Sequence, residues 1–255
     1  MKVVILAGGR GSRLAEETQD LPKPMVTVGG HPILWHIMKI YSHYGLSDFV
    51  ICLGYKGYVI KEYFANYRLY NSDVTFDLSN DSVEYFRDDA EPWRVTLLET
   101  GLDTATGGRL KRVQPLIGDE PFCFTYGDAV ADIDIRALID FHNSGAAVAT
   151  VTGVRPPGRF GALTTEGDDI VRFAEKPETG DDSINGGFFV LSPEIFDHIE
   201  GDDTIWESGP LPRLAGERKL RVFRHAGFWK CMDTVRDREQ LEALWASEDV
   251  PWRVW

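Results

Sequence analysis

The sequence predicts an α/β protein whose core is a Rossmann-like, mixed but mostly parallel sheet, flanked by helices and carrying a small β insertion. Three observations predict this fold class. Short apolar runs that suit buried parallel strands recur along the chain. Segments with apolar residues at helical spacing alternate with these runs. Two of the runs end directly in glycine, as strands do where they open into a ligand-binding loop.

The first half of the chain shows the clearest alternation of strands and helices. We expect strands at 2–7, 49–53 and 122–126, and helices at 32–44 and 58–67. Two further segments, 74–86 and 93–98, alternate polar and apolar residues like exposed or antiparallel strands. An acidic stretch separates these two segments, and together they predict the β insertion.

The second half continues the mixed pattern. We expect strands at 146–151, 162–165, 170–173 and 187–191, and helices at 135–141, 206–215 and 236–246. The sequence has no internal repeat and no linker long enough to separate independent domains. We therefore predict a single domain over residues 1–255.

Composition narrows the class of protein. Forty acidic against 27 basic residues leave a formal charge of -13, which opposes nonspecific attraction to nucleic acid or to an anionic membrane. The apolar runs are far shorter than the ~18 residues of a membrane span, and the chain does not begin like a signal peptide. Three widely spaced cysteines predict free thiols, two in buried strands and one in a loop. We expect a cytoplasmic protein that binds neither nucleic acid nor membrane.

The first expected strand runs into a glycine-rich loop. Gly8, Gly9 and Gly11 follow it at once, interleaved with Arg10 and followed by Arg13. Glycines directly after a buried strand let backbone N–H groups approach an anion closely, so phosphate binding is the leading interpretation. A tight structural turn is the alternative. The third glycine of the dinucleotide pattern GxGxxG is missing, and no GxxxxGK[ST] motif occurs in the chain.

A constrained lysine follows the loop. Pro22 and Pro24 restrict the backbone on both sides of Lys23. An ordinary surface lysine is the alternative, but the preceding glycine loop favours a lysine that is positioned to neutralise phosphate charge. Lysine and arginine that converge on one phosphate chain suit phosphoryl or nucleotidyl transfer.

Two aspartates are candidate Mg²⁺ ligands. Asp128 follows a buried strand and a glycine, at the end of the sheet where doubly wound folds bind their ligands. Asp233 precedes the last expected helix, so it is either a second ligand or only the N-cap of that helix. Asp132 and Asp134 lie close by, and the simpler interpretation is that one or both cap the helix that begins near residue 135.

The glycine loop and the proline-flanked lysine together resemble the signature of the sugar-1-phosphate nucleotidylyltransferases, the nucleotide-sugar pyrophosphorylases. The rest of the chain is similar to the branch of this family that uses CTP, on segments 16–18, 33–38, 54–64, 106–112, 125–128, 156–163, 175–177, 185–190 and 227–234. Two departures are Ser12, where the family usually has threonine, and Leu21, where cytidylyl-transferring members often have lysine. The fold implied is the nucleotide-diphospho-sugar transferase type.

The resemblance also implies roles for individual residues. Mg²⁺ would be held by Asp128 and Asp233. Catalytic roles would fall to Arg13, Lys23, Asp128, Lys176 and Asp233. The nucleotide would be bound by Leu6, Gly8, Gly9, Gly11, Ser12, Arg13, Lys23, Thr106, Gly107 and Gly108. The sugar phosphate would be bound by Gly161, Glu175, Lys176, Asn185 and Gly186. Residues 1–130 would thus mainly bind nucleotide, and residues 131–255 would mainly bind sugar phosphate and supply the C-terminal helices.

The reaction implied is transfer of a cytidylyl group from CTP to α-D-glucose 1-phosphate, with release of pyrophosphate. Two alternatives stay open: a relative that uses UTP, dTTP or another sugar phosphate, and a binding module without turnover. Members of the family form homo-oligomers. The segment 74–98 or the C-terminal tryptophans Trp245, Trp252 and Trp255 could supply the interface, and packing within the chain's own core is the equal alternative for the tryptophans.

Overall fold

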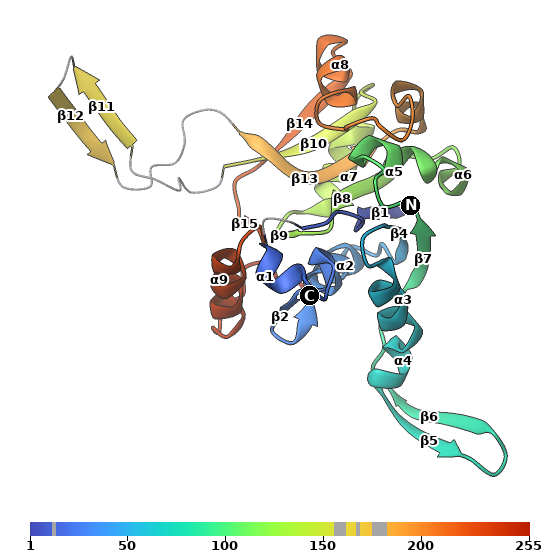
Figure 1. Cartoon of the computed structure of the whole chain (residues 1–255). Coiled ribbons are helices and arrows are strands. Elements are labelled where there is room, and N and C mark those ends of the chain that lie inside the picture. Colours follow the sequence, from blue (N-terminus) through green and yellow to red (C-terminus); the bar gives the residue numbers. More distant parts are fainter. Residues whose placement is uncertain (12–13, 156–161, 167–168, 175–182) are drawn as a thin grey trace.

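The computed structural model describes residues 1–11, 14–155, 162–166, 169–174 and 183–255. At its centre lies a seven-stranded sheet (Figure 1). The strands follow one another in the order β14 (Leu220–His225), β10 (Ala149–Val154), β13 (Ile184–Leu191), β8 (Phe122–Tyr126), β1 (Val3–Leu6), β4 (Asp48–Leu53) and β7 (Arg94–Glu99). Only β13 runs antiparallel to its neighbours in this sheet. The mixed, mostly parallel sheet predicted from the sequence is therefore confirmed.

Helices cover both faces of the sheet. Alternate residues of each central strand enter opposite cores, as Val3 and Val4 do in β1. One core includes residues of α2 (Ile33–His43), α3 (Gly57–Ala65), α7 (Ile135–Asn143) and α9 (Val235–Trp245). The other includes residues of α5 (Thr106–Arg112), α6 (Gln114–Ile117), η3 (Pro193–His198) and α8 (Pro210–Gly216). The short helices α1 (Ala15–Thr18), η2 (Lys23–Met25) and α4 (Tyr67–Tyr70) lie in the connections.

Four small antiparallel pairs accompany the main sheet. They are β2 (Thr27–Val28) with β3 (His31–Pro32), β5 (Ser72–Asp77) with β6 (Ser82–Asp88), β9 (Ala129–Ala131) with β15 (Trp229–Cys231), and β11 (Ala162–Glu166) with β12 (Asp169–Ala174). The β5–β6 hairpin projects from the body of the molecule, at the lower right of Figure 1. It is the predicted β insertion.

Some sequence-based boundaries were wrong. The segment 93–98 was expected in the insertion, but it forms β7, the parallel edge strand that pairs with β4. Edge position explains the pattern, because β7 is only half-buried and so alternates like an antiparallel strand. The helix expected from residue 206 begins at Pro210, and the strand expected at 146–151 begins three residues later at Ala149. Cys231, expected in a loop, lies in β15.

The carboxyl ends of the parallel strands define where a ligand can bind. Leu6 at the end of β1 pairs with Tyr126 at the end of β8 and with Cys52 near the end of β4. The chain leaves β1 to form β4 on one side, whereas β8 lies on the other side, so β1 marks a point where the strand order reverses. Open α/β sheets bind their ligands at such points. The loops that follow β1 and β8 therefore start side by side at the expected position of a site.

The C-terminal segment packs onto the chain's own core. Trp252 is fully buried, and its indole N–H donates to Nδ1 of His36, at 3.4 Å. Nε2 of His36 lies 2.9 Å from the carbonyl oxygen of Val28, so the neutral ring carries its proton on Nε2. Of the three C-terminal tryptophans, Trp252 thus belongs to the core of its own chain. No helix among the described residues is long and apolar enough to cross a membrane.

We expect the neutral ring of His36 to make the fold sensitive to mild acid. Burial lowers the pKa of His36 from 6.5 to about 4. The unfolded chain therefore takes up this proton as the pH falls through about 6.5, whereas the folded chain takes it up only near pH 4. The contribution of His36 to the free energy of unfolding is therefore fully present above the pKa of the unfolded chain. It is lost as the pH falls from that value toward the pKa of the folded chain. The free energy of unfolding should be roughly 2 kcal/mol lower near pH 5 than near pH 7.

Denaturant titrations at these two pH values check the prediction. His36→Gln can still donate to the Val28 carbonyl but cannot titrate, so its loss of stability in acid should be smaller by that amount. His142, whose pKa burial also lowers, contributes equally to both proteins. An unchanged pH dependence in His36→Gln would contradict the assignment to this ring.

Candidate active site

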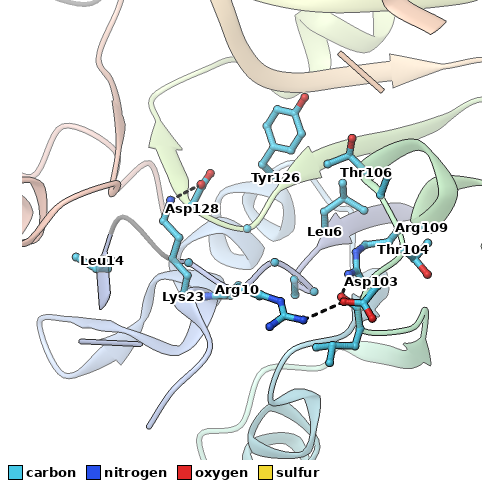
Figure 2. Close-up of a pocket in the computed structure, with 18 of the residues that line it drawn as sticks. Leu6, Arg10, Leu14, Lys23, Asp103, Thr104, Thr106, Arg109, Tyr126 and Asp128 are labelled. Carbon is cyan, nitrogen blue, oxygen red and sulfur yellow. Dashed lines mark hydrogen bonds and ion pairs between the residues drawn. The ribbon is translucent and has the colours of Figure 1, made fainter. Parts of the chain in front are cut away.

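A cavity of about 560 Å³ opens at the carboxyl ends of β1 and β8. Figure 2 shows Lys23 and Asp128 on one side of it and Thr104, Thr106 and Arg109 on the opposite side. Its lining combines backbone-rich and charged segments: Leu6, Ala7, Gly8, Gly9, Arg10, Gly11, Leu14, Lys23, Pro24, Leu102, Asp103, Thr104, Ala105, Thr106, Arg109, Tyr126, Gly127, Asp128 and Asp233. Eight of the residues predicted from the sequence are among them: Leu6, Gly8, Gly9, Gly11, Lys23, Thr106, Asp128 and Asp233.

The glycine loop lies close against its neighbours where it leaves β1. A Cβ on Gly8 would come within 2.2 Å of the Arg109 guanidinium, so any larger residue there would have to displace that group. Gly11 has a φ of +62°, a conformation that favours glycine. Within the part of the chain that the structure describes, the amide N–H groups of Gly8, Gly9 and Gly11 meet no acceptor. Backbone donors left without protein partners at the cavity wall fit the predicted binding of an anion.

Two prolines hold the backbone on either side of Lys23, whose side chain lines the cavity. Pro22 precedes the first residue of η2, and Pro24 is buried within it. Pro24 packs against Gly127, where an added Cβ would lie 3.0 Å from Pro24 Cγ and 2.7 Å from the Leu6 carbonyl oxygen. The proline-flanked lysine and the glycine–aspartate pair after β8 are therefore parts of one contact. This contact explains why the two motifs occur together.

Lys23 joins two carboxylates. Its Nζ lies 2.7 Å from Oδ2 of Asp128 and 2.5 Å from Oδ1 of Asp233, although 105 and 210 residues separate the partners in sequence. Burial alone would lower the pKa of Lys23. The negative charges of Asp128 and Asp233, and the hydrogen bonds that the ammonium donates to them, outweigh burial and raise this pKa. The lysine is therefore a fixed cation.

Asp233 reaches the site through a local strand pair. Cys231 in β15 pairs with Ala129 in β9, and Met232 N donates to the Asp128 carbonyl oxygen at 2.8 Å. The alternative role for Asp233, capping the last helix, is excluded: Thr234 caps α9 through a capping box. Asp134 is the N-cap of α7, as the sequence suggested.

The carboxylate pair fits a divalent cation. Asp128 and Asp233 already converge on a single cationic group, the Lys23 ammonium, which marks a position between them where positive charge is stabilised. One positive and two negative charges leave this cluster with a net negative charge, which disfavours a triphosphate until a further cation is added. Mg²⁺ prefers one or two carboxylates together with substrate phosphates.

Arg109 organises the opposite wall. It is 5% exposed, and its Nη1 donates to the carbonyl oxygens of Leu53 (3.0 Å) and Gly101 (2.7 Å) and to the hydroxyl of Thr100 (2.8 Å). Leu53 is the last residue of β4, and Thr100 and Gly101 follow β7, so one guanidinium connects the ends of two strands to α5. Its charge lies next to the glycine loop, where it favours an anionic ligand.

A second arginine spans the mouth of the cavity. Arg10 Nη2 donates to Asp103 Oδ1 at 2.9 Å, between the glycine loop and the loop before α5, as the dashed line in Figure 2 shows. Both side chains are mostly exposed, at 62% and 84%, so this pair contributes little to stability.

The predicted base-binding residues divide into two groups. Thr106 lines the cavity, whereas the amides of Gly107 and Gly108 donate to the Thr204 carbonyl oxygen, at 2.9 and 3.2 Å. A Cβ on Gly108 would lie 2.3 Å from the Asp202 carbonyl oxygen. Close packing against residues 202–204 thus accounts for both glycines, and their contact with a base stays a prediction.

The structure describes only two of the residues predicted to bind the sugar phosphate. Asn185 and Gly186 are the second and third residues of β13. Asn185 Nδ2 lies 3.4 Å from the Tyr126 hydroxyl, and the Gly186 carbonyl oxygen accepts from Trp229 Nε1 at 2.7 Å. Five predicted site residues lie outside the described residues: Ser12, Arg13, Gly161, Glu175 and Lys176.

Sequence reasoning did not assign roles to several residues that line the cavity. Tyr126 and Arg109 belong to segments that carried the family resemblance, and their place at a strand end and in the first turns of a helix was a usable signal. The pairing of Arg10 with Asp103 gave no comparable signal, because it joins loops 93 residues apart.

Comparison with known proteins shows the family to which the chain belongs. A family model described as nucleotidyl transferase matches residues 2–212, so the chain belongs to the nucleotidyl transferase family. Over its full length it is 56% identical to the glucose-1-phosphate cytidylyltransferase of Salmonella typhi, and the alignment covers 100% of both chains. It is 46% identical, with the same coverage, to the probable glucose-1-phosphate cytidylyltransferase of Bacillus subtilis (strain 168). These relatives confirm the resemblance drawn from the motifs, for the family and for its cytidylyl-transferring branch.

Solved structures agree on the fold. HddC from Yersinia pseudotuberculosis superposes with a TM-score of 0.70 at 24% identity, covering 96% of this chain and 99% of that one. A UDP-glucose pyrophosphorylase complexed with UDP-glucose gives a TM-score of 0.67 at 16% identity, covering 96% and 97%. The predicted nucleotide-diphospho-sugar transferase type of fold is therefore confirmed.

Proposed function

We propose that this protein transfers the cytidylyl group of CTP to α-D-glucose 1-phosphate, forming CDP-glucose and pyrophosphate. The observation that carries the proposal is the 56% identity, over the whole chain, to a protein named glucose-1-phosphate cytidylyltransferase. The cavity supports it, because its lining combines backbone donors, a fixed lysine and two carboxylates at the switch point of the sheet.

The residues of the cavity suit a direct displacement. A phosphate oxygen of the sugar attacks the α-phosphorus of CTP, and pyrophosphate leaves. The attacking phosphate is ionised at neutral pH, so the reaction requires no protein nucleophile or general base. The chain's contribution is to hold both substrates in line and to stabilise the charge that develops on the phosphates. We assign this stabilisation to the amides of the glycine loop and to the ammonium of Lys23.

We further propose that Asp128 and Asp233 hold Mg²⁺. When bound, this ion would neutralise phosphate oxygens of the nucleotide and assist departure of pyrophosphate. The two carboxylates would then bind the ion in place of the Lys23 ammonium, which becomes free to contact the phosphates. Ser12 and Arg13 are proposed to complete the phosphate site. Gly161, Glu175, Lys176, Asn185 and Gly186 are proposed to bind the sugar phosphate.

A homo-oligomer in the cytoplasm is part of the proposal. The β5–β6 hairpin supports the homo-oligomer, because it exposes large apolar side chains: Phe76 is 52% exposed, Phe86 67% and Leu78 92%. A two-stranded hairpin is marginally stable alone in water, and a second chain would cover these side chains.

Nucleotide specificity is the most direct test. We expect pyrophosphate release, measured with Mg²⁺ and glucose 1-phosphate, to be at least about tenfold faster in kcat/KM with CTP than with UTP, dTTP, ATP or GTP. Varying the sugar phosphate with the best nucleotide then tests the second substrate. Equal or faster turnover with UTP or dTTP would keep the reaction and remove the cytidylyl assignment. Turnover with no pair would favour a binding module.

A further inference from the structure

The carboxylate of Glu207 joins two walls of the cavity. The hydroxyl of Tyr126, at the end of β8, donates to Oε1 of Glu207 at 2.6 Å. The hydroxyl of Thr106, at the start of α5, donates to Oε2 at 2.8 Å. Tyr126 and Thr106 both line the cavity, whereas Glu207 lies behind them in the segment between η3 and α8. Each carboxylate oxygen therefore orients one cavity hydroxyl.

These contacts fix the polarity of the two hydroxyls. A hydroxyl carries one hydrogen, and both Thr106 and Tyr126 give theirs to Glu207. Thr106 also accepts from Trp206 N at 2.9 Å, and Tyr126 accepts from Asn185 Nδ2 at 3.4 Å. Toward a ligand, both hydroxyls can thus only accept. They match groups that donate, such as the ribose hydroxyls and the exocyclic amino group of a cytosine nucleotide.

The phenol is held in its protonated form. Burial first, and the charge of Glu207 next, raise the pKa of Tyr126. Tyr126 therefore keeps its hydrogen over the whole range of physiological pH. The ring itself is fixed by Phe124 and Phe189, with centroids 5.9 and 6.0 Å away.

The segment that carries Glu207 is anchored although Glu207 itself is exposed. Trp206 is fully buried against Phe124 and Phe189, with centroid distances of 5.7 and 5.8 Å. The backbone of the segment accepts from α5, with Ala105 N donating to the Asp202 carbonyl oxygen at 2.8 Å. The glycines at 107 and 108 permit this close approach. Packing of the neighbouring backbone and of Trp206 therefore holds the Glu207 carboxylate in place, although the carboxylate itself is exposed.

We propose that Glu207 is a positioning residue for the nucleotide: acting through Tyr126 and Thr106, it presents two hydroxyls as acceptors to the donor groups of the nucleoside. The proposal rests on the proposed function, because it deepens the same site. The proposal gives Glu207 no role in the chemistry of the phosphates, since Lys23 and Asp128 lie on the other side of the cavity from Thr106 (Figure 2).

Glu207→Gln tests the proposal. The amide nitrogen of glutamine cannot accept, so at least one of the two hydroxyls loses its acceptor and turns. We expect the Kd for CTP, measured by calorimetry, and the KM for CTP to rise about tenfold, with kcat changed less than threefold. Glu200→Gln is the matched control, because Glu200 forms an exposed ion pair with Arg213 and does not line the cavity. Its values should stay within twofold of wild type.

The same substitution in a second variant distinguishes a positioning role of Glu207 from direct contact between Glu207 and the nucleotide. In Tyr126→Phe/Thr106→Val, Glu207 has no hydroxyl to orient, so adding Glu207→Gln should change the Kd for CTP less than twofold. A tenfold further loss there would mean that Glu207 meets the nucleotide itself, and would overturn the proposal. So would an unchanged Kd in the single variant. Thermal unfolding identifies any variant that is misfolded, in which case Glu207→Asp, which shortens the reach, takes its place.

Turnover of the wild-type protein is read separately. If UTP or dTTP proves the better substrate, the proposed function changes, and the same variants are compared with that nucleotide. If no pair turns over, calorimetry still measures nucleotide binding. Failure of the proposed function and failure of the role of Glu207 are therefore distinct results.

Discussion

Lys23→Met is expected to lower kcat/KM for CTP by at least ~10²-fold. Methionine keeps the apolar stem of the side chain but removes the ammonium that lies between Asp128 and Asp233. Two consequences follow. The phosphates lose a cation in the transition state, and two carboxylates are left facing each other without it. Steady-state pyrophosphate release at saturating Mg²⁺ measures the effect, and most of it should fall on kcat if the ammonium acts on the developing charge.

Lys219→Met is the matched control. Lys219 also forms an ion pair, with Glu217 at 2.8 Å, but it is 45% exposed and does not line the cavity. Its loss should change kcat/KM less than twofold, because exposed pairs contribute little. Near-wild-type activity of Lys23→Met would remove this lysine from the catalytic machinery and would reduce it to a structural bridge between two loops.

The parts of the fold that the sequence predicted are those with a local cause. Short, mostly apolar runs such as those of β1 and β8 are buried on both faces, so their length and the glycine that follows each of them identify them as strands. The segment that became β7 has a mixed pattern because an edge strand is covered incompletely. Whether such a strand joins the main sheet depends on its pairing with β4, more than 40 residues away, which no window of sequence contains.

The same distinction applies to the site. Glycines after a strand and a lysine between prolines are local features, and the structure places them at one cavity. The convergence of Asp128 with Asp233 depends on the β9–β15 pair. The local sequence offered the two aspartates only as separate candidates, and the family resemblance alone implied that they meet at one ion. Glu207 carried no local signal at all. Its role comes from hydrogen bonds that span 81 and 101 residues.

Asp128→Asn is expected to weaken binding of a divalent cation at least ~10-fold and to lower kcat/KM at least ~10²-fold. The amide removes a negative charge and one anionic oxygen, while its size stays the same. Binding of Mn²⁺ in the presence of CTP, followed by the fall in free Mn²⁺ signal in electron paramagnetic resonance, measures the first effect without turnover. Raising the metal concentration should restore part of the activity if the lost group is a ligand.

Asp134→Asn is the control, because asparagine caps a helix as well as aspartate does and Asp134 caps α7 outside the cavity. Asp233→Asn should behave like Asp128→Asn. Since both carboxylates are proposed to hold one ion, the double variant should lose far less than the product of the two single losses. Full additivity would mean that the aspartates act independently, and an unchanged Mn²⁺ affinity in both single variants would place the metal elsewhere. In that case the two carboxylates serve only to fix Lys23, and the charge on the phosphates must be neutralised by the lysine and the arginines of the glycine loop.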